Sequence, residues 1–147
     1  MFYLFALVVF LADRSIKYII TSQMAPGRSI SIIKAFLNIT YVRNTGVAFG
    51  LFPGKRLFLV LIGLAICAIV IYFNSKTSRE NMLLKLCLTI ILGGSLGNLF
   101  DRIFFGYVID YLDFRVFPVF NLADIAINLG VFLIIMDFVF KRDKCTR

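Results

Sequence analysis

Any acid–base chemistry in this chain depends on eight acidic side chains, because the sequence contains no histidine. They are Glu80 and the aspartates at positions 13, 101, 110, 113, 124, 137 and 143. Without histidine, Ser-His-Asp and Cys-His triads and His-ligated zinc sites each lack a necessary member. The three cysteines, Cys67, Cys87 and Cys145, fit neither a disulfide framework nor the spacing of metal ligands. We therefore expect neither a metal ion nor a cofactor.

A pair of aspartates is sufficient for one kind of chemistry, the hydrolysis of a peptide bond. Two neighbouring carboxylates cannot both ionise cheaply, so one holds a proton while the other stays charged. The charged carboxylate takes a proton from water as the water attacks the peptide carbonyl, and the protonated one supports the oxyanion and then the leaving amine. We select Asp110 and Asp124 as this pair, although periodicity alone does not bring them together.

The composition indicates that these residues are carried by an integral membrane protein. The 147 residues are 61% hydrophobic and 16% charged, and the mean hydropathy is +0.93. A soluble domain has about 25% charged residues, and an apolar excess of this size cannot all be hidden inside a small protein. The net charge of +8 is spread between and beyond the apolar segments instead of forming a patch. We therefore expect no nucleic-acid partner.

Four segments are long and apolar enough to cross a bilayer, which takes about 20 residues. They are residues 2–20, 57–73, 82–100 and 120–140. The first lacks the basic start and the cleavage site of a secretory signal, so we expect it to be retained as a helix. The sequence thus predicts an all-α membrane fold of four transmembrane helices, forming one domain over residues 1–147.

The distribution of basic residues predicts the orientation of these helices. The short loop 74–81 and the tail 141–147 hold six of the lysines and arginines. The positive-inside rule then places both termini and this loop in the cytoplasm, and the two long loops outside. Within the first outer loop, Ile30–Asn44 is rich in β-branched and aromatic residues. We expect short strands there, which form a small extracytoplasmic cradle at the membrane surface.

In this orientation most polar residues of the helices gather at the outer edge of the membrane. The set comprises Asp13, Arg14 and Lys17 in the first helix, Asn98, Asp101 and Arg102 in the third, Asn121 and Asp124 in the fourth, and Asp110 and Asp113 in the loop before it. Ionisable residues in or near hydrocarbon are costly, so such a cluster indicates a functional site.

Members of this cluster also have structural explanations. Asp13 and Lys17 have the i,i+4 spacing of a helix ion pair, Asn121 and Asp124 suit helix caps, and Asp101 and Arg102 suit a charge pair at the interface. The glycines Gly93, Gly94 and Gly97 are typical of closely packed membrane helices. Two other functions remain open, a small transporter or channel that uses Asp13 and Lys17, and a passive scaffold that needs no paired acids.

Five motifs follow one another along the chain. They are DRSIK at 13–17, RNTGVAFG at 43–50, GGSLGNLFDR at 93–102, VIDYLDF at 108–114 and FNLADIAIN at 120–128. With these motifs, in this order and with four spans, the chain resembles lipoprotein signal peptidase (signal peptidase II) of bacterial inner membranes. The resemblance implies an aspartic endopeptidase that removes the signal peptide from prolipoproteins, by cutting just before a diacylglyceryl-modified cysteine.

The resemblance also implies roles for individual residues. The catalytic pair falls on Asp110 and Asp124, and the residues that bind or support the substrate are Asn44, Gly46, Asn98, Arg102 and Asn121, with Asp13 and Lys17 holding the structure or helping to bind substrate. Ser95, where alanine is common, and the additional acid Asp113 are minor departures. The implied partners are lipid-modified prolipoproteins and membrane lipid, and we expect a monomer whose active site faces outward.

Overall fold

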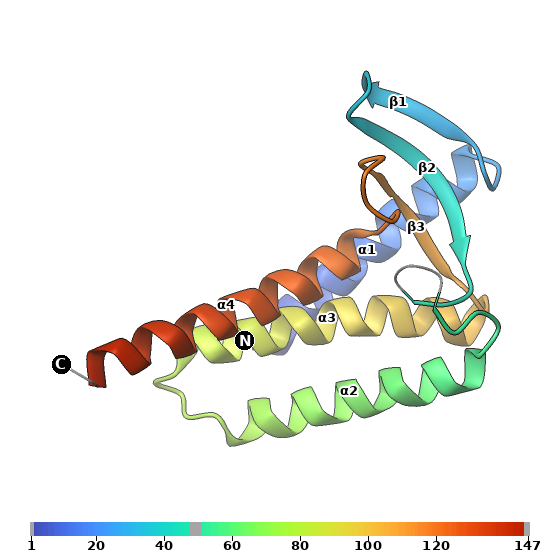
Figure 1. Ribbon diagram of the computed structural model, residues 1–147. Coiled ribbons are helices and arrows are strands. Elements are labelled where there is room, and N and C mark those ends of the chain that lie inside the picture. The colour runs from blue at the N-terminus through green and yellow to red at the C-terminus, as the bar shows by residue number, and fades with distance from the viewer. Residues whose placement is uncertain (1, 48–50, 146–147) are drawn as a thin grey trace.

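A computed structural model describes residues 2–47 and 51–145 (Figure 1). The described elements are α1 (Phe2–Gln23), β1 (Ser29–Ile33), β2 (Leu37–Asn44), α2 (Arg56–Lys76), α3 (Met82–Phe104), β3 (Val108–Asp113) and α4 (Leu122–Cys145). Each predicted span therefore lies in one helix, apart from the first two residues of the 120–140 window. The end of the RNTGVAFG motif, at residues 48–50, falls outside the described residues, as do both chain termini.

Three of the described helices are long and apolar enough to cross a membrane. They are α2, α3 and the Leu122–Phe140 part of α4. The remaining helix, α1, has 22 residues but carries Asp13, Arg14 and Lys17. Because of these three charges, the composition of α1 differs from that of the other helices, although its length is similar.

Helix α3 is the centre of the bundle, with α1, α2 and α4 packed around it (Figure 1). Its glycines allow this close packing, as their spacing predicts. A Cβ atom on Gly93 would lie 2.6 Å from the Ala6 carbonyl oxygen of α1, and one on Gly94 would lie 2.5 Å from the Ala123 carbonyl oxygen of α4. Both distances are shorter than real Cβ contacts, so α1 and α4 approach α3 as closely as they do only because glycine is present.

The three strands form one antiparallel sheet in the order β1-β2-β3 beyond one end of the bundle. The sequence predicts strands in the first outer loop and places Asp110 in the second outer loop. In the structure, β3, which carries Asp110, comes from the second loop, and Asp110 pairs in register with Val42 of β2. Val108, Ile109, Asp110 and Tyr111 are all buried, so β3 lacks the alternation that would have revealed a strand.

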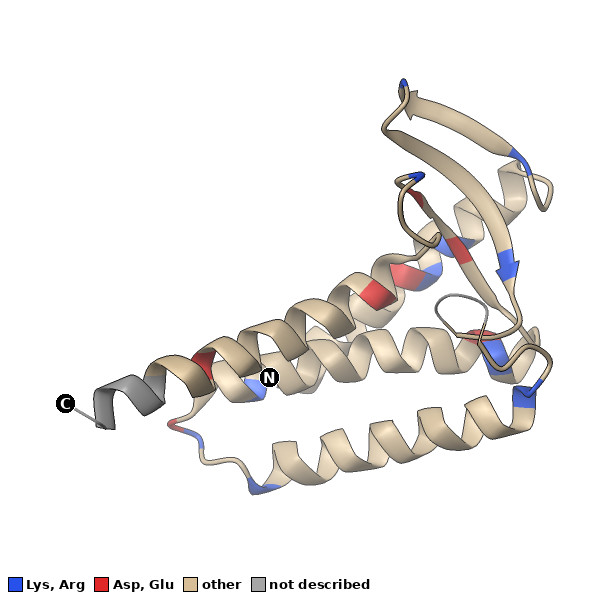
Figure 2. Cartoon of the chain, viewed as in Figure 1, with Lys and Arg blue, Asp and Glu red and all other residues tan. Residues whose placement is uncertain are grey.

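Charged residues gather at the sheet end of the bundle, as Figure 2 shows. The apolar stretch of α2 carries no charge from Leu57 to Ser75. The expected convergence of polar residues from different helices is therefore present, and it lies where α1, α3 and α4 meet β3.

Candidate active site

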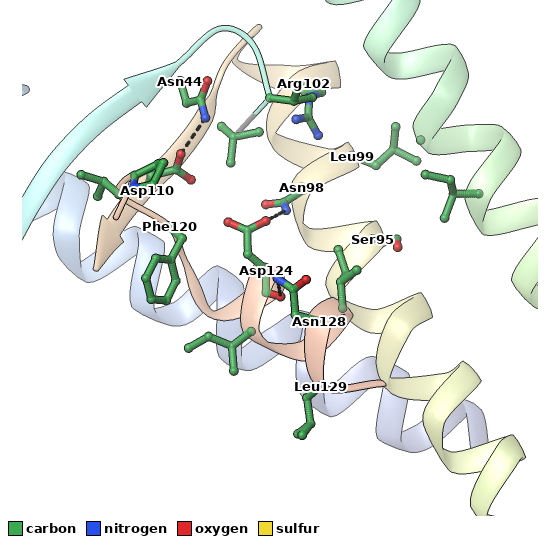
Figure 3. A pocket seen from close by; sticks show the side chains of 18 of the residues that line it. Asn44, Ser95, Asn98, Leu99, Arg102, Asp110, Phe120, Asp124, Asn128 and Leu129 are labelled. Atoms are coloured by element: carbon green, nitrogen blue, oxygen red, sulfur yellow. Dashed lines mark hydrogen bonds between the residues drawn. The ribbon is translucent and has the colours of Figure 1, made fainter. Parts of the chain in front are cut away.

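Asp110 and Asp124 line the same cavity, whose volume is ≈ 740 Å³. Asp110 lies in the middle of β3 and is only 2% exposed. Asp124 lies in the first turn of α4 and is partly exposed. The two carboxylates come from different elements and face the same space (Figure 3). The structure thus places Asp110 and Asp124 at one cavity, which sequence periodicity alone could not predict.

Each oxygen of the two carboxylates accepts one hydrogen bond. The Asn44 side-chain amide donates to Asp110 Oδ2 at 2.9 Å, and that of Asn121 donates to Oδ1 at 2.7 Å. For Asp124, the Asn98 amide donates to Oδ1 at 2.8 Å and the backbone N–H of Asn121 donates to Oδ2 at 3.2 Å. These donors hold both carboxylates in place.

Asn121 combines the cap and the site roles that the sequence left as alternatives. Its Oδ1 accepts a hydrogen bond from the backbone N–H of Asp124 at 2.9 Å, which caps α4. Its Nδ2 donates to Asn98 Oδ1 at 3.1 Å as well as to Asp110. The side chain of Asn121 is fully buried. The same amide therefore starts α4 and connects Asp110 with Asn98.

The two aspartates differ in how deeply they are buried. Burial raises the pKa of Asp110 from the usual 3.8 to about 7; the charge of Asp124 adds to the rise, and the amides of Asn44 and Asn121 oppose it. Asp124 is instead partly exposed and lies in the first turn of α4. Acid–base hydrolysis by two carboxylates needs one of them protonated, and the raised pKa of Asp110 suits it to that role.

Arg102 and Gly46 connect the segment after β2 to α3. Arg102 lines the cavity, and its Nη2 donates to the Gly46 carbonyl oxygen at 3.2 Å. The Gly46 N–H donates to Asn44 Oδ1 at 2.9 Å, so Gly46 also holds the side chain that donates a hydrogen bond to Asp110. The alternative pairing of Asp101 with Arg102 is wrong, because Asp101 instead forms ion pairs with Arg14 and Lys17.

Asp13, Lys17 and Asp101 form a fully buried ion cluster behind the cavity. The Lys17 ammonium lies 2.9 Å from Asp13 Oδ2, as the i,i+4 spacing predicts, and 2.8 Å from Asp101 Oδ2. None of the three lines the cavity, unlike Asn44 and Asn98. Sequence reasoning missed Asp101 as a partner of Lys17. Its position three residues after Asn98, on the same face of α3, is the signal that would have found it.

The cavity has a second, apolar part that extends between the helices. It is lined by Gly63 and Ile66 of α2 and by Leu129 and Phe132 of α4. Two aromatic residues of the β3–α4 segment, Phe117 and Phe120, also line the cavity. The cavity therefore has a polar wall at the sheet end and an apolar channel toward the middle of the bundle.

Within the part of the chain that the structure describes, no group of three or more acidic or cysteine side chains is arranged to hold a metal ion. The chemistry that the site itself offers is that of two carboxylates, one buried and one at a helix N-terminus, with amide and guanidinium donors around them. These groups suffice to activate a water molecule and to protonate a leaving group.

The chain is similar to known proteins over almost its whole length. The model of the family described as signal peptidase (SPase) II matches residues 5–140. A lipoprotein signal peptidase from Halothermothrix orenii is 42% identical over 98% of this chain and 98% of its own length. A protein of the same name from Staphylococcus aureus is 38% identical over 96% of this chain and 91% of its own. Two solved structures, each described as a bacterial membrane enzyme studied by the in meso method, are also similar. The first has a TM-score of 0.91 and 36% sequence identity, and the match covers 96% of this chain and 88% of the solved chain. The second has a TM-score of 0.84 and 37% identity, and the match covers 92% of this chain and 90% of the solved chain.

Proposed function

This chain belongs to the signal peptidase II family of membrane peptidases, and we propose that Asp110 and Asp124 are its catalytic dyad. The observation that carries the proposal is that both carboxylates line one cavity in unlike environments. Asp124 is the base that takes a proton from the attacking water. Asp110 is the acid, which supports the oxyanion and then protonates the leaving amine.

The substrate that we propose is a prolipoprotein, cut just before a diacylglyceryl-modified cysteine. The polar wall supports this assignment, because Asn44, Asn98 and Arg102 present amide and guanidinium donors to backbone and ester carbonyls. The apolar channel beside Ile66 and Phe132 suits the signal peptide or an acyl chain. A scissile bond at the membrane edge then meets the dyad without leaving the bilayer.

The proposed topology has four spans within a single domain over residues 1–147, with α1 as the fourth span. Two of its charged residues, Asp13 and Lys17, are fully buried. The exposed surface of α1 is instead apolar, with Leu4, Leu7 and Leu11 about half exposed or more. A helix of this kind can face lipid while its charges face protein. We propose that both termini lie in the cytoplasm and that the dyad lies on the outer side of the bacterial inner membrane. We also propose that the protein is a monomer.

The test of the dyad is cleavage of a diacylglyceryl-modified precursor by the purified protein in detergent. Asp110→Asn and Asp124→Asn should each abolish cleavage. Asp113→Asn is the matched control, because Asp113 is in the same strand but lies outside the cavity lining and accepts a hydrogen bond from the Thr40 hydroxyl at 2.7 Å. This variant should keep its activity.

The result that would overturn the proposal is full cleavage by either dyad variant. If the control loses activity as well, the carboxylates of β3 act through the stability of the sheet. Thermal unfolding of the three variants separates these cases, because a catalytic substitution lowers the rate without lowering the unfolding temperature.

A further inference from the structure

Two carboxylates outside the cavity bind the backbone immediately before the two dyad residues. Asp13 Oδ1 accepts a hydrogen bond from the N–H of Ala123 at 3.2 Å, and Ala123 precedes Asp124. Asp101 Oδ2 accepts one from the N–H of Ile109 at 3.2 Å, and Ile109 precedes Asp110. The two aspartates thus hold equivalent positions, one beside α4 and the other beside β3.

Lys17 joins these two carboxylates to each other and to the polar wall. Its ammonium lies within 3.0 Å of three acceptors, Asp13 Oδ2, Asp101 Oδ2 and Asn98 Oδ1. An ammonium group has three donors, so all of them have an acceptor in reach. Asn98 in turn donates from its Nδ2 to Asp124 at 2.8 Å. A continuous set of contacts therefore leads from α1 to both members of the dyad.

The charges within this set balance. Arg14 forms an ion pair with Asp101 and lies over the Phe100 ring, with its Cζ atom 4.8 Å from the ring centroid. Asp13 and Lys17 form the other pair of opposite charges. Buried ion pairs contribute little net stability compared with apolar packing, because burying the charges is costly. A role in geometry explains the cluster better than a role in stability.

We propose that Asp13, Lys17 and Asp101 are positioning residues that hold the backbone before each dyad aspartate and do not touch the substrate. This inference rests on the proposed dyad and goes beyond it. The N–H that each buried carboxylate binds belongs to the residue immediately before Asp110 or Asp124, one peptide unit away from the Cα atom of that aspartate. Small displacements there change the separation of the two carboxylates, on which the shared attack on one carbonyl depends.

The test compares two charge-balanced double variants that differ at position 13, where one keeps an acceptor for the Ala123 N–H and the other does not. Asp13→Asn with Lys17→Met removes both charges but keeps a side-chain oxygen that can accept the Ala123 hydrogen bond. Asp13→Ala with Lys17→Met removes the charges and the acceptor. We expect kcat of the second double variant to be at least about tenfold below that of the first, with KM the same within about threefold.

A second pair of variants tests the contact between Asp101 and Ile109, in case the Asp13→Ala, Lys17→Met protein does not fold. It consists of Asp101→Asn or Asp101→Ala, each combined with Arg14→Met, and acts on the Ile109 hydrogen bond. The same split between kcat and KM is expected. The matched control is Asn74→Leu with Thr89→Val, which removes a buried polar contact of 3.3 Å between α2 and α3, away from the cavity. It should leave kcat unchanged.

Three outcomes would overturn the inference. Equal kcat values within a pair would mean that the acceptor does not position the dyad. A change confined to KM would mean that the cluster binds substrate. If both acceptor-free proteins unfold while their partners fold, the cluster maintains the fold only. The Asp110→Asn variant separates failure of this inference from failure of the proposed dyad. If Asp110→Asn still cleaves the precursor, the dyad proposal itself is refuted.

Discussion

Replacing Gly97 with alanine tests how tightly α1 and α3 must pack to keep the two aspartates of the proposed dyad in place. A Cβ atom on Gly97 would lie 2.5 Å from Asp13 Oδ2, whereas ordinary contacts begin at 3.4 Å, so the two groups must separate by about 0.9 Å. The Asp13 carboxylate cannot simply rotate away, because it holds the Ala123 N–H and the Lys17 ammonium. The strain must therefore move α1 or break these contacts.

The structure sets the size of the expected effect. Overpacking in a buried position costs about 1–3 kcal/mol of folding free energy. A displacement near 1 Å beside reacting groups lowers the rate about 100-fold. We therefore expect Gly97→Ala to lower the unfolding temperature modestly and kcat by one to two orders of magnitude, on the order of the loss expected for misplaced catalytic groups.

The assay is cleavage of a fluorescent diacylglyceryl-modified precursor peptide in detergent, with thermal unfolding followed by far-ultraviolet circular dichroism. Gly93→Ala is the matched control. Its Cβ would lie 2.6 Å from the Ala6 carbonyl oxygen, so it strains the same helix pair about one turn before Gly97 on α3 and about two turns before Asp13 on α1. Both variants should lose stability, but only Gly97→Ala should lose kcat beyond that loss. Equal kcat values in the two variants would refute the reasoning.

Three further predictions concern proton binding and the polar wall. Cleavage should decline as the pH rises through about 7, because Asp110 then loses the proton that it donates, and undiminished activity well above this pH would assign the acid elsewhere. The unfolding temperature should fall between pH 3.8 and about 7, since the folded protein keeps a proton on Asp110 that the unfolded chain releases near 3.8. Asp110→Asn should remove that slope, and a slope that survives must come from another group. Arg102→Ala should raise KM at least about tenfold, the loss expected for a charged hydrogen bond, because its guanidinium lines the cavity and holds Gly46. Unfolding of this variant in detergent would make Arg102 structural instead.

The sequence predicted the features of this fold that depend on local spacing. Apolar windows of membrane-spanning length indicated the helices, and the i,i+4 spacing of Asp13 and Lys17 indicated an ion pair that the structure contains. The three small residues of α3 likewise indicated close packing. Each of these signals lies within about one helical length of chain.

The features that the sequence did not predict depend on contacts between distant segments. Lys17 and Asp101 are 84 positions apart, and they meet only because Gly97 lets the Asp13 side of α1 approach α3. The sequence did not predict β3 as a strand. Its first four residues are all buried, so the usual alternation of buried and exposed residues is missing. Its identity as a strand follows from pairing with β2, which local propensity does not encode.

The two-part cavity has a consequence for resistance to inhibitors of this enzyme. Along its polar wall, Asn44 and Asn98 each bind a carboxylate of the proposed dyad, so we expect a substitution that evades an inhibitor there to harm catalysis as well. Along the apolar channel, Ile66, Leu129 and Phe132 contribute shape alone and can exchange for other apolar side chains. We therefore expect compounds that take their affinity from the polar wall to leave fewer viable resistance substitutions than compounds that fill the channel.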